Sequence, residues 1–126
     1  MKKTLEIRIY GDPVLRSKAV PVEDVNDDVR ALADKMVATM HAGDGIGLAA
    51  EQIGRRESIC VVDVPVEMDL DGNNRRLNPG LNMPLVLINP RITSSSKETD
   101  VSEEGCLSLP EVLLPVQRAQ TVNLEY

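Results

Sequence analysis

Apolar residues recur at helical spacing in residues 26–41, the most regular stretch of the chain. These apolar residues are Val29, Leu32, Met36, Val37 and Met40. Asn26 is a typical N-cap, and the acids Asp27 and Asp28 suit the first turn of a helix. The pattern therefore predicts a helix of about four turns, with Gly43 in the left-handed conformation that often ends a helix.

Beyond this helix the apolar period changes to that of strands. Runs of β-branched residues at 58–64 and 84–93 predict two strands against the helix, and Pro90 in the second indicates a bulge or a sheet edge. Residues 101–110 and 121–126 alternate, or nearly so, and predict two more strands. One helix among such strands predicts an α+β fold, in which an N-terminal helix packs with antiparallel or mixed β-strands.

The remaining segments carry turn signals. Residues 10–22 hold two prolines and a Gly-Asp-Pro turn, which predict an extended N-terminal arm anchored by Val14 and Leu15. Residues 68–83 are polar and contain Asp-Gly and Pro-Gly, so we expect an exposed loop or hairpin. No repeat or linker divides the 126 residues, which predicts a single domain. The strand pattern is still continuing at Tyr126, so we expect this domain to be incomplete.

Composition narrows the class of protein. The chain carries 14 bases and 20 acids, and its net charge of −6 opposes non-specific binding to nucleic acid or to anionic membranes. No apolar run is long enough to span a membrane, and no apolar segment follows the basic residues of "MKKTLEIRIY", so we expect a cytoplasmic protein. Two cysteines are too few for a disulfide scaffold and are expected as free thiols.

The stretch "GIGLAAEQ", residues 45–52, directly follows the expected helix. Taken alone, it is most simply a tight turn in which small residues let two backbones approach. It is not a phosphate loop, because a helix precedes it and a strand follows it. Its chemistry would lie in the backbone groups of Ile46 and Gly47, which could pair with an extended peptide, and in the Gln52 amide, which could donate to a developing oxyanion.

Cys106 lies in a second unusual stretch, "EEGCLSLP". A lone cysteine is most often a small buried hydrophobe. Here Gly105 removes side-chain bulk before it, and Glu103 and Glu104 disfavour a thiolate unless a positive group such as a metal cation lies close by. A nucleophilic thiol would need a base, and the chain's one histidine, His41, is expected to be a solvated residue at a helix end.

Together, "GIGLAAEQ" followed by "EEGCLSLP" resembles the first two signature motifs of the peptide deformylases. The stretches "YGDPVLRSKAVPV", "MVATMHAGDG" and "VLINPRI" are similar to that family's N-terminal arm, its first helix and the strand before its cysteine motif. The resemblance implies a metal-dependent hydrolase that removes the formyl group from the N-formylmethionine of nascent proteins, an N-terminal processing step of protein biosynthesis. The implied partners are N-formylmethionyl peptides, met at the ribosome exit.

The resemblance also implies a role for each motif residue. Cys106 would give its thiolate to the metal, usually iron(II), which zinc, nickel or cobalt can replace. The Gln52 amide and the backbone N–H of Leu107 would bind the formyl oxygen as it becomes tetrahedral. Ile46 and Gly47 would pair with the substrate backbone.

Other matched positions would support the site. Glu104 and Arg118 would form an ion pair near the cysteine, and Gly45 and Gly105 would shape the backbone around it. Two positions depart mildly from the family pattern: a proline or small polar residue is frequent at the position of Glu51, and some members carry an arginine at that of Leu113.

A third departure is more serious. In the family a helical His-Glu-x-x-His motif supplies two metal ligands and the general acid/base, and these 126 residues contain no such stretch. One cysteine cannot hold a catalytic divalent ion, whose site needs three protein ligands and a water. We therefore expect a C-terminally truncated deformylase that is inactive as it stands and does not hold a metal stably.

Two functions from different classes stay open. One is a metal-dependent deformylase that is catalytically incomplete as it stands, and the other is a deformylase-like remnant that binds peptides without catalysis. A third hypothesis, a thiol hydrolase, would need Cys106 and His41 within hydrogen-bond reach. In each case the apolar faces of the strands at 84–93 and 121–126 would lie open, so we expect the chain to self-associate.

Overall fold

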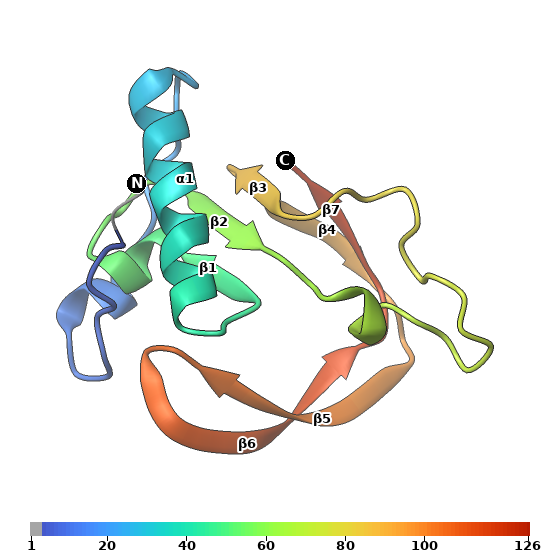
Figure 1. Ribbon diagram of the computed structural model, residues 1–126. Helices are drawn as coiled ribbons and strands as arrows, with labels where there is room; N and C mark the ends of the chain where they lie inside the picture. The colour runs from blue at the N-terminus through green and yellow to red at the C-terminus, as the bar shows by residue number, and fades with distance from the viewer. Residues whose placement is uncertain (1–3) are drawn as a thin grey trace.

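One helix lies against a small antiparallel sheet (Figure 1). The computed structural model describes residues 4–126, so the basic start at residues 1–3 lies outside the described residues. Helix α1 (Asp27–Ala42) packs against β1 (Gly47–Ala49) and β2 (Ile59–Val62). A third strand, β3 (Leu85–Ile88), completes the sheet in the order β1-β2-β3. The sheet therefore has β1 at one edge.

The hydrophobic core lies between α1 and this sheet. Met36 and Met40 from α1 and Val61 from β2 are fully buried. Aliphatic side chains and methionine fill the interior of a chain whose only aromatic residues are two tyrosines. The expectation that the helix packs on the strands is confirmed.

The remaining strands form two antiparallel pairs outside this centre. Strand β4 (Arg91–Ser95) pairs with β7 (Val122–Glu125). Strand β5 (Thr99–Cys106) pairs with β6 (Leu109–Ala119) as a hairpin. Because all pairs of named strands in the described part of the chain are antiparallel, the α+β fold is confirmed in its antiparallel form.

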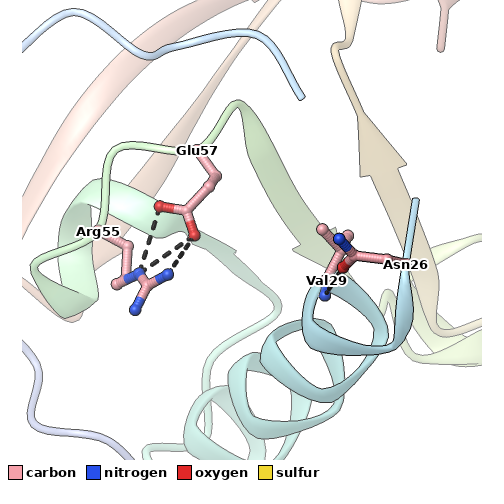
Figure 2. Close-up of polar contacts among 4 residues, drawn as sticks. All are labelled: Asn26, Val29, Arg55 and Glu57. Carbon is pink, nitrogen blue, oxygen red and sulfur yellow. Dashed lines mark hydrogen bonds and ion pairs between the residues drawn. The ribbon is translucent and has the colours of Figure 1, made fainter. Parts of the chain in front are cut away.

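The ends of α1 show one expectation confirmed and one wrong. The Asn26 side chain caps the helix by accepting a hydrogen bond from the backbone N–H of Val29, 3.0 Å away (Figure 2). Gly43 is not left-handed, because its φ is −94°, and Asp44 takes that conformation instead at φ 56°. Gly43 serves close packing: a Cβ there would lie 3.0 Å from Leu107 Cδ2.

Two strand expectations also change. Residues 84–93 are two strands, and the chain passes from one sheet to another at Asn89, whose φ is 52°, and Pro90. The expected strand at 101–110 turns back after Cys106, and most of β6, which contains Pro110 and Pro115, was not expected as a strand. In a two-stranded sheet each strand has a free edge, where proline costs no ladder hydrogen bond.

The N-terminal arm contains a turn and a short 3-10 helix at Pro13–Arg16, where an extended path was expected, and its backbone is extended at both ends of this helix, at Asp12 and Ser17. It runs beside the segment before β2, where Val20 bridges Glu57. There Arg55 donates hydrogen bonds to Glu57, the shortest 2.6 Å (Figure 2). This contact lowers the pKa of Glu57 and raises that of Arg55.

Two more 3-10 turns, Ala50–Ile53 and Val66–Met68, complete the described elements. Residues 68–83 form the expected loop, although its Asp69 is buried. Within residues 4–126, no helix combines the length and the apolar character that crossing a membrane requires.

Candidate functional site

The two sequence motifs meet at Gln52. The 3-10 turn Ala50–Ile53 places this side chain beside the end of β5, although the two segments are 54 residues apart in the chain. Its Nε2 lies 3.6 Å from Cys106 Sγ and 3.2 Å from Ser108 Oγ, and donates to both. The amide and the thiol that the sequence singled out are therefore direct neighbours.

The orientation of the Gln52 amide follows from its other contact. The backbone N–H of Ala49 donates to Gln52 Oε1 at 3.0 Å. Because a backbone N–H can only donate, the amide oxygen must face Ala49 and the NH₂ group must face Cys106. The donor end of the amide therefore faces Cys106 and Ser108.

A hairpin turn positions Leu107, which is partly buried. Leu107 and Ser108 form the turn between β5 and β6, and Leu107 packs against the hydrophobic core. A Cβ on Gly45 would lie 2.7 Å from Leu107 Cδ1, too close to be accommodated without a shift. One on Gly105 would lie 3.2 Å from Leu113 Cδ2. Both glycines therefore admit a neighbouring leucine to the space where their own side chain would be.

Strand β1 offers a free backbone edge next to this turn. The Ile46 carbonyl accepts a hydrogen bond from the Asp63 N–H at 2.9 Å, so it is already engaged with the segment after β2. In an antiparallel ladder the next pair, Gly47 and Val62, is not hydrogen-bonded, and the backbone groups of Gly47 face away from β2. Of the two residues expected to pair with a peptide, Gly47 presents its groups to the open edge.

Residues 8–10, which lead into the N-terminal arm, hold both motifs through backbone N–H groups. The N–H of Arg8 donates to the carbonyl of Gln52 at 2.7 Å, and the N–H of Tyr10 donates to the carbonyl of Ser108 at 2.8 Å. Two residues of one extended segment thus fix the two site segments relative to each other.

Glu104 and Arg118 form an ion pair across the β5–β6 hairpin. The guanidinium donates two hydrogen bonds to the carboxylate, at 3.0 and 2.9 Å. Through this contact Arg118 lowers the pKa of Glu104, and Glu104 raises that of Arg118. Both side chains are partly solvated, so the pair fixes hairpin geometry more than it stabilises the fold.

His41 and Cys60 stand apart from this site. His41 Nε2 lies 2.7 Å from Asp63 Oδ2, and among residues 4–126 no hydrogen bond joins His41 to Cys106. The geometry that a thiol hydrolase would need is therefore not formed. Cys60 lies in β2, where burial raises the pKa of its thiol.

A metal site is not assembled by the described residues alone. Cys106 is exposed and free, which suits a thiolate ligand. Within residues 4–126, however, no three His, Cys, Asp or Glu side chains are grouped so that they could hold a metal ion. A catalytic divalent ion needs three such ligands, so these residues do not fit a complete site.

Sequence reasoning missed Ser108. It is one of three buried polar or charged side chains in the described part of the chain, and it contacts Gln52 directly. The turn between two strands is normally solvent-exposed, so a buried hydroxyl is not expected there. The only signal was the position of the serine between two leucines.

This arrangement matches a known family. A family model described as polypeptide deformylase matches residues 4–126. The chain belongs to the peptide deformylase family. A peptide deformylase from Rhizobium meliloti is 44% identical over 118 residues, and one from Thermotoga sp. is 38% identical over 120 residues.

Solved peptide deformylases share the fold. The enzyme from Ehrlichia chaffeensis superposes with a TM-score of 0.87 at 35% identity, covering 98% of this chain and 68% of that one. The class I type b enzyme from Acinetobacter baumannii, solved with Met-Ala-Ser bound, gives a TM-score of 0.84 at 30% identity, covering 100% of this chain and 77% of that one.

The alignments with curated relatives cover nearly all of this chain but a smaller share of each relative. The alignments cover 94% of this chain but 62% of the Rhizobium protein, and 95% of this chain but 63% of the Thermotoga protein. The chain thus spans less than two thirds of the length of these relatives.

Proposed function

We propose that this protein is a peptide deformylase, a hydrolase that removes the formyl group from N-formylmethionyl peptides. The contact between Gln52 Nε2 and Cys106 Sγ carries the proposal, because it brings two family motifs to one point. In this role the Gln52 amide and the Leu107 N–H bind the formyl oxygen. Their hydrogen bonds strengthen as that oxygen gains charge in the tetrahedral state.

Peptide binding would use the free edge of β1. Gly47 pairs with the backbone of the N-terminal peptide as an added strand, and Ile46 flanks this contact. The relative solved with Met-Ala-Ser bound supports a short methionyl peptide as the ligand class. We place this action in the cytoplasm, on nascent chains at the ribosome exit.

The proposal includes a catalytic metal ion and the expectation that these 126 residues alone are inactive. Iron(II) is the metal we propose for a complete site, with zinc, nickel or cobalt as replacements and Cys106 as one ligand. A polypeptide of these 126 residues alone should not turn over formyl peptides, because it gathers one ligand and its single histidine pairs with Asp63. The free β1 edge also suits the alternative, a non-catalytic peptide-binding module.

Binding is tested on the ¹⁵N-labelled 126-residue polypeptide by titration with formyl-Met-Ala-Ser. We expect shifts of the Gly47 and Leu107 backbone amides and of the Gln52 side-chain amide, with weaker binding of unformylated Met-Ala-Ser as the control. Binding of neither peptide, or shifts confined to other regions, would contradict the proposed site.

Turnover separates the two candidate functions. The 126-residue polypeptide supplied with iron(II) should release no formate, and turnover at rates typical of the family would refute its catalytic incompleteness. The same assay is then applied to protein from its natural source, together with an intact-mass measurement. Formate release there supports the deformylase, and its absence from a natural product of 126 residues supports the binding module.

A further inference from the structure

Ser108 is a buried hydroxyl whose partner belongs to the other motif. Its residue is 5% exposed, and its Oγ accepts from Gln52 Nε2 at 3.2 Å. The other two buried polar residues in the described part of the chain have partners outside the two motifs. Thr39 joins α1 to the backbone of Leu5, and Asp69 organises its loop. Ser108 alone among them contacts a residue of the proposed chemistry.

The hydrogen bonds of Gln52 engage its amide oxygen and its amide nitrogen with different partners. Oε1 accepts from the Ala49 N–H. Nε2 carries two hydrogens and lies 3.2 Å from Ser108 Oγ and 3.6 Å from Cys106 Sγ, so it can donate one hydrogen to each. Sulfur is a weak acceptor, so this last hydrogen bond is the one that an incoming oxygen can replace.

The Ser108 hydroxyl is not needed to hold its own turn. The backbone of Ser108 is tied separately, because its carbonyl accepts from the Tyr10 N–H at 2.8 Å. An alanine would occupy almost the same space and would bury no polar atom. The hydroxyl therefore acts on Gln52 rather than on the packing of the hairpin.

We propose that Ser108 is a positioning residue whose hydroxyl holds one Nε2 hydrogen of Gln52, so that the other faces the space beside Cys106 where a formyl oxygen binds. This inference deepens the proposed deformylase function and rests on it. Ser108 touches neither the peptide nor the reacting carbon, and it acts through the direction of the amide. It thereby contributes to the preference for formylated over free N-termini.

The first test observes the amide itself. In ¹⁵N-labelled protein the two Nε2 protons of Gln52 give separate signals because rotation about an amide C–N bond is slow, and both should exchange slowly with solvent because each has its own acceptor. Ser108→Ala should shift the signal of the proton that faces residue 108 and speed its exchange. Ser102→Ala, which changes an exposed serine of the same hairpin, should leave them unaltered. Unchanged Gln52 signals in Ser108→Ala would overturn the proposal.

The second test measures ligand preference. The ratio of dissociation constants for Met-Ala-Ser and formyl-Met-Ala-Ser should fall in Ser108→Ala by about three- to tenfold, the effect of one weakened hydrogen bond. Gln52→Leu should show at least as large a fall, and the double variant should be no worse than Gln52→Leu, because both changes act on one amide.

The outcomes separate positioning from structure. Additive losses in the double variant, or a lowered melting temperature with an unchanged ratio, would assign Ser108 to the fold and overturn the proposal. If the unmodified protein binds neither peptide, the proposed function fails, and the Gln52 amide signals still decide whether Ser108 orients that side chain.

Discussion

At the scale of single residues, the site depends on a glycine whose lack of a side chain leaves room for a neighbouring leucine. Gly45 leaves open the space that Leu107 fills, since a Cβ there would come within 2.7 Å of Leu107 Cδ1. Leu107 in turn sets the position of the hairpin turn that carries Ser108 and follows Cys106. A substitution at Gly45 is therefore felt at the site through packing, without touching a polar group.

Gly45→Ala should push Leu107 out of place and lower the free energy of unfolding by about 1–3 kcal/mol, the usual cost of overpacking. Urea denaturation of the 126-residue polypeptide measures the change. Gly47→Ala is the matched control, because the nearest atom to a Cβ there is 3.9 Å away. Equal effects of the two substitutions would show that the Leu107 contact is not the cause.

Residue identity made part of the site predictable. Cys106 and Gln52 carry the functional groups that metal and oxyanion chemistry need, and their motifs are distinctive in sequence. Ser108 could not be found in this way, because its importance comes from the burial of a turn. The turn is buried by contacts with segments that are distant in the chain, and the local sequence does not indicate such contacts.

At the scale of elements, α1 was predictable because its determinants are local. Its apolar period, the Asn26 cap and the acids of its first turn all act within the helix itself. The break at Pro90 and the strand β6 could not be predicted in this way. Both depend on which sheet a strand joins and which of its edges is free.

Asn26→Ala should lower the free energy of unfolding by about 1 kcal/mol, because the N–H of Val29 loses its acceptor. The midpoint of urea denaturation reports the loss. Asn26→Asp keeps an acceptor at the same place and should remain close to the unmodified protein. A loss in the aspartate variant as large as that in the alanine variant would argue against capping.

The loop at 68–83 should respond to pH through Asp69. Hydrogen bonds from Asn78, and then from Arg76, lower the pKa of this buried carboxyl. Its contribution to stability is therefore complete above the ordinary aspartate pKa of about 4 and is lost as pH falls through the lowered value.

Asp69→Ala should be less stable than the unmodified protein at neutral pH, and the difference in urea midpoint should shrink below about pH 4. Asp24→Ala, at an exposed position, serves as the control. A difference that stays constant into strong acid would show that the carboxylate form is not what the loop requires.

At the scale of the whole molecule, apolar side chains lie open on the outer strands. Ile92 of β4 and Leu124 of β7 are directly paired across the ladder and are 62% and 36% exposed. Val122 and Tyr126 are exposed at 50% and 62%. An apolar face of this kind, carried by strands with free edges, favours association between copies.

The 126-residue polypeptide should therefore self-associate, and the double variant Ile92→Thr/Leu124→Thr should do so less. Threonine retains a strand-forming side chain while removing apolar surface. Sedimentation velocity over a range of protein concentrations measures both proteins. A monomeric unmodified chain at every concentration, or no difference between the proteins, would contradict association through this face.

The hydrogen bonds donated by the backbone of Arg8 and Tyr10 determine which substitutions can reveal the role of this segment. Both are donated by backbone N–H groups, so they do not depend on which side chains the arm carries. An alanine scan would leave both hydrogen bonds in place, whereas proline at either position removes the donor and with it one of these two backbone links to the motifs. The side chains of this segment can therefore change while its backbone keeps the same path. A comparison of residue identities between sequences would not detect these two contacts.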